Sequence, residues 1–240
     1  MLSLFFIPDL GDGSTILVEG DEAHHAIKVM RMEVGEELQL SNGRGDWAQG
    51  RIASSTKNSF ILEVTERGHT GRSHPEMVVI QALTKSDRAK ETIELLVEGG
   101  ADRIIAWQSD HCIAKWKPDM HGKWQNAALA AAKQSRRYSI PVIEEPITLT
   151  QIRERFTSHS LLLVLHESAS EKLSVVVSPS AISFNEIVIV IGPEGGLSVD
   201  EVRELEAIGG KIVRLGNPVL RSAHAGLAGL AAVAALIKHW

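Results

Sequence analysis

The sequence predicts an α/β protein with a small β-rich domain followed by a larger domain built on a mostly parallel sheet. The β-branched run Ile187–Ile191 leads directly into Gly-Pro-Glu-Gly-Gly, and such a run is typical of a strand buried on both faces. From residue 76 onward, extended apolar runs alternate with helical patterns, which argues for a parallel sheet with helices on its faces. Residues 1–70 instead carry short extended runs separated by turn signals.

The amino-terminal part, residues 1–70, is expected to form a small barrel or a curled sheet. A turn cluster at residues 41–46 separates two apolar runs and predicts a hairpin. Residues 68–75 are polar, contain glycine and end in proline, so we interpret them as the connection between domains, with 71–75 as the linker proper. Strands are expected at 5–7, 15–18, 37–40, 47–52 and 59–65, and one helix at 21–32.

Residues 76–240 are expected to form the second domain. Gly99-Gly100 and Gly209-Gly210 are predicted to end two of its helices. Strands are expected at 77–83, 103–107, 141–144, 161–165, 187–191 and 211–215, and helices at 87–98, 119–137, 150–156, 199–208 and 222–239.

The stretch 186–198 combines a strand, a glycine loop and a helix start. Ser198 and Glu201 fit a capping box, in which the serine caps the helix and the glutamate reaches back. Gly195 and Gly196 permit a close approach of a ligand to the main chain. No Lys-Ser/Thr follows the loop and no G-x-G-x-x-G stands at a strand end, so the common nucleotide motifs do not explain it. The loop predicts a ligand site, of a kind the loop alone does not specify.

The composition limits which partners, metal sites and membrane segments the protein can have. The 240 residues are 44% hydrophobic and 23% charged, with a net charge of −5, so any RNA would have to meet local basic patches. The single cysteine, Cys112, excludes an intrachain disulfide and a cysteine-rich zinc site, and we expect it to be a packing residue. Residues 223–237 are too few to span a bilayer. We therefore expect a cytoplasmic protein with no membrane segment and no metal.

Several segments carry a resemblance to one family. They read IVIGPEGGLS (189–198), VRLGNPVLRS (213–222) and AAAKQSRR (130–137), together with an H-x-x-x-V-x-R-x-x-x-G pattern at 25–35 and a K-x-x-R pattern at 85–88. With these motifs the chain resembles, over its whole length, the RsmE family of 16S ribosomal RNA uridine methyltransferases within the SPOUT superfamily.

The resemblance implies a PUA-like RNA-binding β-barrel domain at 1–70 and a SPOUT methyltransferase domain with a deep trefoil knot at 76–240. It also implies S-adenosylmethionine as methyl donor, a homodimer, and methylation of uridine N3 in 16S ribosomal RNA of the small subunit. Three positions depart from the family pattern. Lys133-Gln134 replaces a frequent Glu-Gln, Val97-Glu98-Gly99-Gly100 replaces a frequent E-L-G, and Ala223-His224 stands where relatives often have Glu-Thr after the arginine.

Two alternatives stay open. The departure at Ala223-His224 motivates the first, a ribosome-assembly factor that keeps the fold with little or no activity. The second is a knotted methyltransferase acting on another RNA, for example at a ribose 2′-oxygen, as the resemblance to other knotted enzymes allows.

Two residues are expected to serve the chemistry, because uridine N3 carries a proton that must be removed or a charge that must be stabilised. Arg221, permanently charged, could stabilise a uridine anion, and Glu194 could accept the proton. His224 could also act as a base, although packing or capping is an equal interpretation.

The expected donor pocket lies in three loops after buried strands and comprises Leu165, His166, Ile191, Gly192, Pro193, Gly195, Gly196, Leu215, Gly216, Asn217, Val219 and Leu220. The residues expected to contact RNA are Arg31, Arg44, Arg51, Lys85, Arg88, Gln134, Arg136 and Arg137. Trp107, Trp116 and Trp124 could stack on bases, but we favour packing for them.

Overall fold

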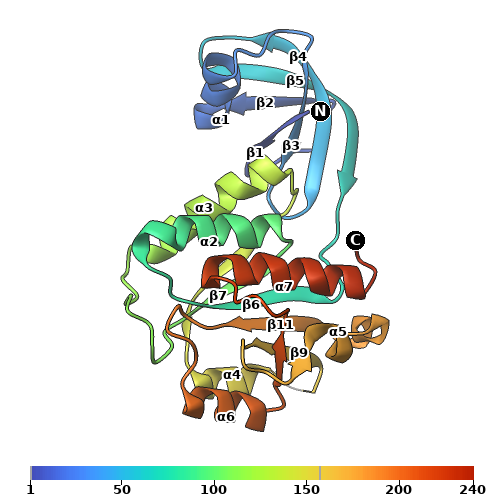
Figure 1. The fold of residues 1–240 in the computed structure, drawn as a ribbon. Coiled ribbons are helices and arrows are strands. Elements are labelled where there is room, and N and C mark those ends of the chain that lie inside the picture. The colour runs from blue at the N-terminus through green and yellow to red at the C-terminus, as the bar shows by residue number, and fades with distance from the viewer. Residues whose placement is uncertain (1, 157) are drawn as a thin grey trace. The chain divides into compact units, whose positions relative to one another are not determined.

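The computed structural model describes residues 2–156 and 158–240, except for the side chains of Ser86 and Asp87. The chain forms two compact units, drawn in Figure 1. One comprises Met1–Arg72 with Ala132–Ile140, and the other comprises Ser73–Ala131 with Pro141–Trp240. The segment Ala132–Ile140 joins the first unit through a hydrogen bond that the Ser41 hydroxyl donates to the Tyr138 carbonyl (2.7 Å) and through stacking of Tyr138 on Trp47.

The first unit is a five-stranded sheet in the order β1-β3-β4-β5-β2, in which only β1 and β3 pair in parallel. Its core includes Phe5, Val18, Leu38 and Leu62, all nearly inaccessible to solvent. The expected strands and hairpin are confirmed. The strands are β1 (Ser3–Phe6), β2 (Thr15–Glu19), β3 (Glu37–Ser41), β4 (Asp46–Ser55) and β5 (Ser59–His69).

Several boundaries in this unit differ from expectation, and two of them have a clear structural cause. Strand β5 extends through Gly68 and His69, the first residues of the predicted connection, because the β4 ladder continues to Trp47 and Asp46 opposite them. The predicted helix over 21–32 is α1 (Gly20–His24) followed by a π-helical turn, η1 (His25–Val29). It ends before Arg31, whose φ of 56° lies outside the right-handed helical region.

The second unit is a seven-stranded sheet in the order β10-β12-β9-β11-β6-β7-β8, and every neighbouring pair is parallel. The mostly parallel sheet predicted from the alternating pattern is therefore confirmed. The strands are β6 (Glu76–Ala82), β7 (Arg103–Trp107), β8 (Val142–Ile147), β9 (Ser160–Leu165), β10 (Glu171–Lys172), β11 (Glu186–Ile191) and β12 (Lys211–Arg214).

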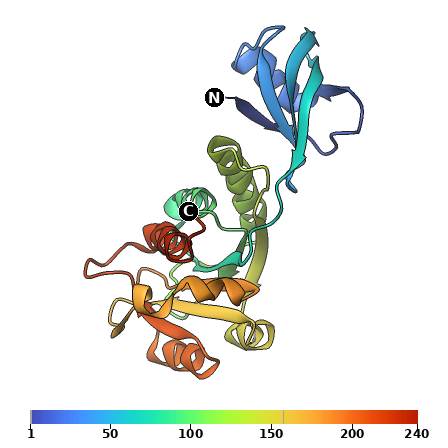
Figure 2. The same cartoon turned by 90° about the vertical axis from the view of Figure 1, so that its right-hand side faces the viewer.

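Helices cover both faces of this sheet, with α2 and α7 on one face and α4 and α6 on the other (Figures 1 and 2). Three short elements between Glu171 and Ser183 were not predicted from the sequence: β10, α5 and η2. The helices are α2 (Ser86–Glu98), α3 (Met120–Ser135), α4 (Leu149–Arg155), α5 (Leu173–Val176), η2 (Pro179–Ser183), α6 (Val199–Ala207) and α7 (Ser222–Leu236).

Helix α7 packs closely because its glycines leave room for neighbours. A Cβ atom on Gly226 would lie 2.3 Å from Leu96 Cδ2 of α2 and 2.9 Å from Ile191 Cδ1 of β11. The small side chains of α7 thus allow it to pack closely against α2 and β11. Within the two described ranges, no helix has both the length and the apolar character needed to cross a bilayer.

Candidate functional site

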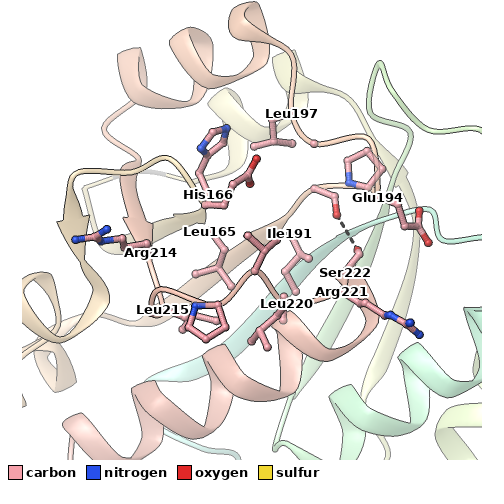
Figure 3. Close-up of a pocket in the computed structure, with 18 residues that line it drawn as sticks. Leu165, His166, Ile191, Glu194, Leu197, Arg214, Leu215, Leu220, Arg221 and Ser222 are labelled. Carbon is pink, nitrogen blue, oxygen red and sulfur yellow. Dashed lines mark hydrogen bonds between the residues drawn. The ribbon is translucent and has the colours of Figure 1, made fainter.

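A cavity of about 330 Å³ opens at the carboxyl ends of β9, β11 and β12 (Figure 3). Parallel α/β sheets commonly bind ligands at this edge. Its walls come from the loop after each strand and from the start of α7. The lining residues are Leu165, His166, Glu167, Ile191, Gly192, Pro193, Glu194, Gly196, Leu197, Arg214, Leu215, Gly216, Pro218, Val219, Leu220, Arg221, Ser222 and Ala225.

The loop after β9 is held by its main chain. The amide of His166 donates to the carbonyl of Val213 (2.9 Å), which continues the pairing of β9 with β12. The His166 Nδ1 atom accepts a hydrogen bond from the Ser168 amide (3.2 Å). This bond leaves the Nε2 atom as the protonated nitrogen of the neutral ring. The Nε2 atom of His166, a cavity-lining residue, is therefore available as a hydrogen-bond donor.

The glycine loop after β11 closes on itself and then starts α6. Gly196 has φ +75° and its amide donates to the Pro193 carbonyl (2.9 Å), so a side chain here would strain the turn. The predicted capping box is confirmed: the Ser198 hydroxyl accepts from the Glu201 amide, and the Glu201 carboxylate accepts from the Ser198 amide at 2.8 Å. Gly195 does not line the cavity, because its α-carbon faces His111.

Glu201 also ties the glycine loop to the loop after β7. Its carboxylate is only 2% exposed and accepts hydrogen bonds from the Asp110 amide (2.8 Å) and the Ser109 hydroxyl (3.2 Å). The Ser198 hydroxyl in turn donates to the Asp110 carboxylate (2.7 Å). The two loops therefore form one hydrogen-bonded block beside the cavity.

The start of α7 is tied to the same glycine loop. The Ser222 hydroxyl donates to the Gly192 carbonyl (2.7 Å) and accepts from the amide nitrogen of Gln81 (3.1 Å), which is fully buried in β6. Gln81 also donates to the Ala82 carbonyl. Since Ser222 follows Arg221 directly, this network fixes the main chain that carries Arg221.

Charged side chains stand at two sides of the cavity. Figure 3 shows Glu194 and Arg221 on one side and Arg214 on the other, and all three line the cavity. Glu194 and Arg221 are exposed, so each can reach a molecule that enters from solvent. The Nε atom of Arg214 is buried and has no hydrogen-bond partner among the described residues. The arrangement can bind an anionic group at Arg214 and place a carboxylate that can accept a proton, together with a permanent cation, at the opposite rim.

The residues predicted for the donor pocket converge here, apart from Gly195 and Asn217, which lie outside the lining set. Six lining residues are absent from the predicted set: Glu167 and Pro218, which lie within the predicted loops, and Leu197, Arg214, Ser222 and Ala225. Arg214 could have been found from its position, because it ends the strand whose following loop was already assigned. Ser222 gives no such signal, since its role depends on Gln81, which lies far away in the sequence.

Two further residues singled out in the sequence lie outside the cavity lining. His224 is not part of the cavity lining, and its Nε2 atom lies 3.6 Å from the Glu91 carboxylate of α2. Cys112 is half-buried against the core, and burial raises the pKa of its thiol, which fits the expected packing role.

The residues predicted to contact RNA are divided between the units. Lys85 and Arg88 belong to the second unit, around the start of α2. Arg51 forms an ion pair with Glu37 (2.9 Å), and Lys133, at the position that departs from the family pattern, pairs with Glu22. The members in the first unit are Arg31, Arg44, Arg51, Gln134, Arg136 and Arg137.

Comparison with known proteins identifies the family. Residues 72–234 match the model of an RNA methyltransferase domain, and residues 18–65 match an RNA methyltransferase PUA domain. Ribosomal RNA small subunit methyltransferase E of Mycobacterium bovis is 36% identical, covering 99% of this chain and 93% of its own length. The enzyme of that name from Bacillus subtilis is 28% identical over 92% of this chain and 90% of its own.

The fold agrees with these matches. The crystal structure of ribosomal RNA small subunit methyltransferase E from Neisseria gonorrhoeae, bound to S-adenosylmethionine, superposes with a TM-score of 0.87 at 26% identity, covering 98% of each chain. The curled five-stranded sheet is therefore a PUA-like domain, and the seven-stranded unit has the architecture of the SPOUT methyltransferases. The chain belongs to the ribosomal RNA small subunit methyltransferase E family.

Proposed function

We propose that the protein transfers a methyl group from S-adenosylmethionine to N3 of a uridine in 16S ribosomal RNA. Family membership and the S-adenosylmethionine held by the Neisseria gonorrhoeae relative support this assignment. The observation that supports the chemistry most directly is that Glu194 and Arg221 line the same side of one cavity. Three strand-end loops build this cavity.

The cavity fits the donor. Its volume of about 330 Å³ is within the usual range for small-molecule sites. Leu165, Ile191 and Leu215 offer apolar walls for an adenine ring, and the guanidinium group of Arg214, which lines the cavity, can meet the donor's carboxylate. When bound, S-adenosylmethionine supplies a methyl group on a positively charged sulfur, already activated for displacement.

The protein's own contribution is to make N3 of the uracil reactive. We assign Glu194 as the acceptor of the N3 proton and Arg221 as the cation that stabilises the negative charge spreading onto the two flanking carbonyl oxygens. Arg221 suits this role because it stays charged at every working pH. The bond between Ser222 and Gly192 holds the main chain of both loops, so the two groups keep their places.

The departure at Ala223 does not remove a group from the cavity wall. Ala223 is 4% exposed and is not part of the lining. Glu194 and Arg221, the two groups assigned to the chemistry, both line the cavity. We therefore favour an active enzyme over an assembly factor that has lost its activity.

The remaining assignments complete the proposal. We assign residues 1–70 to RNA binding, 71–75 to the linker and 76–240 to catalysis, with a trefoil knot in the latter. Half-exposed small residues of α7, among them Ala228 and Ala232, offer a surface for a homodimer. A ribosomal RNA substrate places the enzyme in the cytoplasm.

The test is a reconstituted reaction. Purified protein is incubated with S-adenosylmethionine labelled in the methyl group and with small subunits that lack the modification, and the RNA is digested to nucleosides. Label in 3-methyluridine supports the proposal. Label in a 2′-O-methylated nucleoside would support the alternative target, and calorimetry showing no donor binding at millimolar concentration would exclude the enzyme.

A further inference from the structure

A second, larger cavity of about 1060 Å³ lies in the same unit and is dominated by lysine. It is formed by the segment entering α2, the loop after β7 and the first half of α3. Among the lining residues whose side chains the structure describes, Asp119 is the only acidic one. The lining lysines are Lys85, Lys90, Lys115, Lys117 and Lys123.

Most of this positive charge is not neutralised within the protein. Lys123 pairs with Asp119 (2.7 Å) and Lys90 with Glu94 (3.5 Å). Among the side chains that the structure describes, no carboxylate lies within ion-pair distance of the ammonium groups of Lys85, Lys115 and Lys117. A chain with a net charge of −5 thus gathers in one groove three lysines that have no ion-pair partner among the described side chains, which favours an anionic occupant.

One lining residue carries a buried hydrogen-bond donor without a described partner. Trp124 is 3% exposed and lines the cavity, and its indole Nε1 has no acceptor among the described residues. Buried indole N–H groups usually have a partner. Ile113, which is 79% exposed, adds apolar surface beside it. The cavity therefore combines cations for phosphates with an apolar floor and a hydrogen-bond donor suited to a nucleobase.

The cavity adjoins the donor pocket. Strands β11, β6 and β7 are consecutive parallel neighbours, so the loops after them meet at one edge of the sheet. His111 Nδ1, in the loop after β7, donates to the carbonyls of Gly195 (3.2 Å) and Gly196 (3.1 Å). The loop that carries Lys115 and Lys117 is thus bonded to the loop that forms one wall of the donor pocket.

We infer that the lysine-lined cavity binds the RNA strand next to the target uridine. Lys85, Lys115 and Lys117 contact phosphates, and one base lies against Ile113 and accepts a hydrogen bond from Trp124. This inference rests on the proposed function and adds a binding surface to it. A strand fits better than an acidic protein segment because the unused donor on the apolar floor matches a flat base with acceptor atoms.

The test compares two double variants that change the net charge equally. Lys115→Ala/Lys117→Ala removes two proposed phosphate contacts, and Lys172→Ala/Lys211→Ala removes two exposed lysines elsewhere in the unit. Affinity for a 16S ribosomal RNA transcript is measured between 50 and 200 mM salt, roughly the range over which phosphate contacts are resolved. Losing two contacts should lower the slope of log affinity against log salt by about 1.4–1.8.

The control pair should keep the wild-type slope, and both pairs should bind S-adenosylmethionine as the wild type does. Trp124→Phe, which keeps the ring in the core, should weaken RNA binding by about tenfold, the usual weight of one hydrogen bond.

An unchanged slope in Lys115→Ala/Lys117→Ala, with wild-type methylation intact, would overturn the inference and leave the proposed function standing. The inference would also be overturned if the double variant lost affinity for whole small subunits but not for the RNA transcript. That result would mean that the cavity binds a ribosomal protein. Failure of the wild type itself to bind the donor or methylate RNA would instead overturn the proposed function.

Discussion

The hydroxyl of Ser222 donates a 2.7 Å hydrogen bond to the carbonyl of Gly192, which joins the first residue of α7 to the glycine loop after β11 (Figure 3). The same hydroxyl accepts from Gln81 in β6. One side chain thus connects a central strand, the glycine loop and the helix start that carries Arg221.

Replacing Ser222 by alanine should loosen this connection. The Gly192 carbonyl and the Gln81 amide would lose a buried partner, at a cost of about 1–3 kcal/mol in the free energy of unfolding. Donor affinity in calorimetry should fall by about tenfold, or about 1.4 kcal/mol. Ser183→Ala, which removes an exposed hydroxyl bonded to Ser180, is the matched control. Wild-type donor affinity in Ser222→Ala would show that the bond does not shape the pocket.

Glu201 should prove essential for stability without touching the ligand. Glu201→Ala leaves the Asp110 and Ser198 amides without their charged acceptor, so the free energy of unfolding should fall by about 3 kcal/mol or more. Glu206→Ala, an exposed position on the same helix, should change it by less than about 0.5 kcal/mol. Chemical denaturation measures the free energy of unfolding of both variants. Equal losses would show that Glu201 does not hold the two loops together.

The close packing of α7 can be tested with two helical glycines. Gly226→Val places atoms against Leu96 and Ile191 and should destabilise the protein by about 1–3 kcal/mol. Gly122 of α3 has no atom within 4 Å of its would-be Cβ, so Gly122→Ala should stabilise the protein by about 0.5 kcal/mol through helix propensity. Opposite shifts of the melting temperature are expected; shifts of the same sign would contradict this packing.

The ion pair between Arg155 and Glu144 (2.5 and 2.7 Å) should stabilise the folded protein less at acid pH than at neutral pH. The Arg155 hydrogen bonds hold the pKa of Glu144 below its ordinary value of 4.5, so the pair stabilises the folded state fully above that pH. The contribution is lost as pH falls through the lower folded-state pKa. Arg155→Gln should therefore be less stable than the wild type at pH 7, with a difference that shrinks in acid. A constant difference from pH 7 to 3, measured by urea denaturation, would argue against the pair.

Much of the second unit could be predicted because its signals are local. The run Ile187–Ile191 is a strand buried on both faces, and Ser198 and Glu201 form the capping box their spacing indicates. The parallel sheet followed from the alternation of strands and helices. Residues of the three strand-end loops also line one cavity, because parallel strands deliver their carboxyl ends to the same edge.

What the sequence could not provide depends on contacts between distant residues. Tyr138 packs with the first unit through Ser41 and Trp47, and no local pattern marks that pairing. From the sequence alone, Gly195 looks as suited to lining the pocket as Gly196. Only the structure shows that His111 lies against Gly195. The unpaired Nε of Arg214 and the indole nitrogen of Trp124 become visible only when burial and partners are known for each atom.

Arg221 should be required for transfer and not for assembly. Arg221→Ala removes the charge beside the cavity while leaving the Ser222 main chain in α7, so donor binding and dimer formation should be retained as methylation is lost by about 100-fold or more. Arg221→Lys, which keeps the charge without the planar fork, should recover part of the rate. Full turnover of Arg221→Ala in the reconstituted assay would remove this residue from the mechanism.

The most direct test of the proposed reaction is mass-spectrometric mapping of modified nucleosides in 16S ribosomal RNA from a strain that lacks this protein. The account predicts that one 3-methyluridine disappears, returns with the wild-type gene and does not return with Arg221→Ala. A 3-methyluridine that persists unchanged in the deletion strain would contradict it.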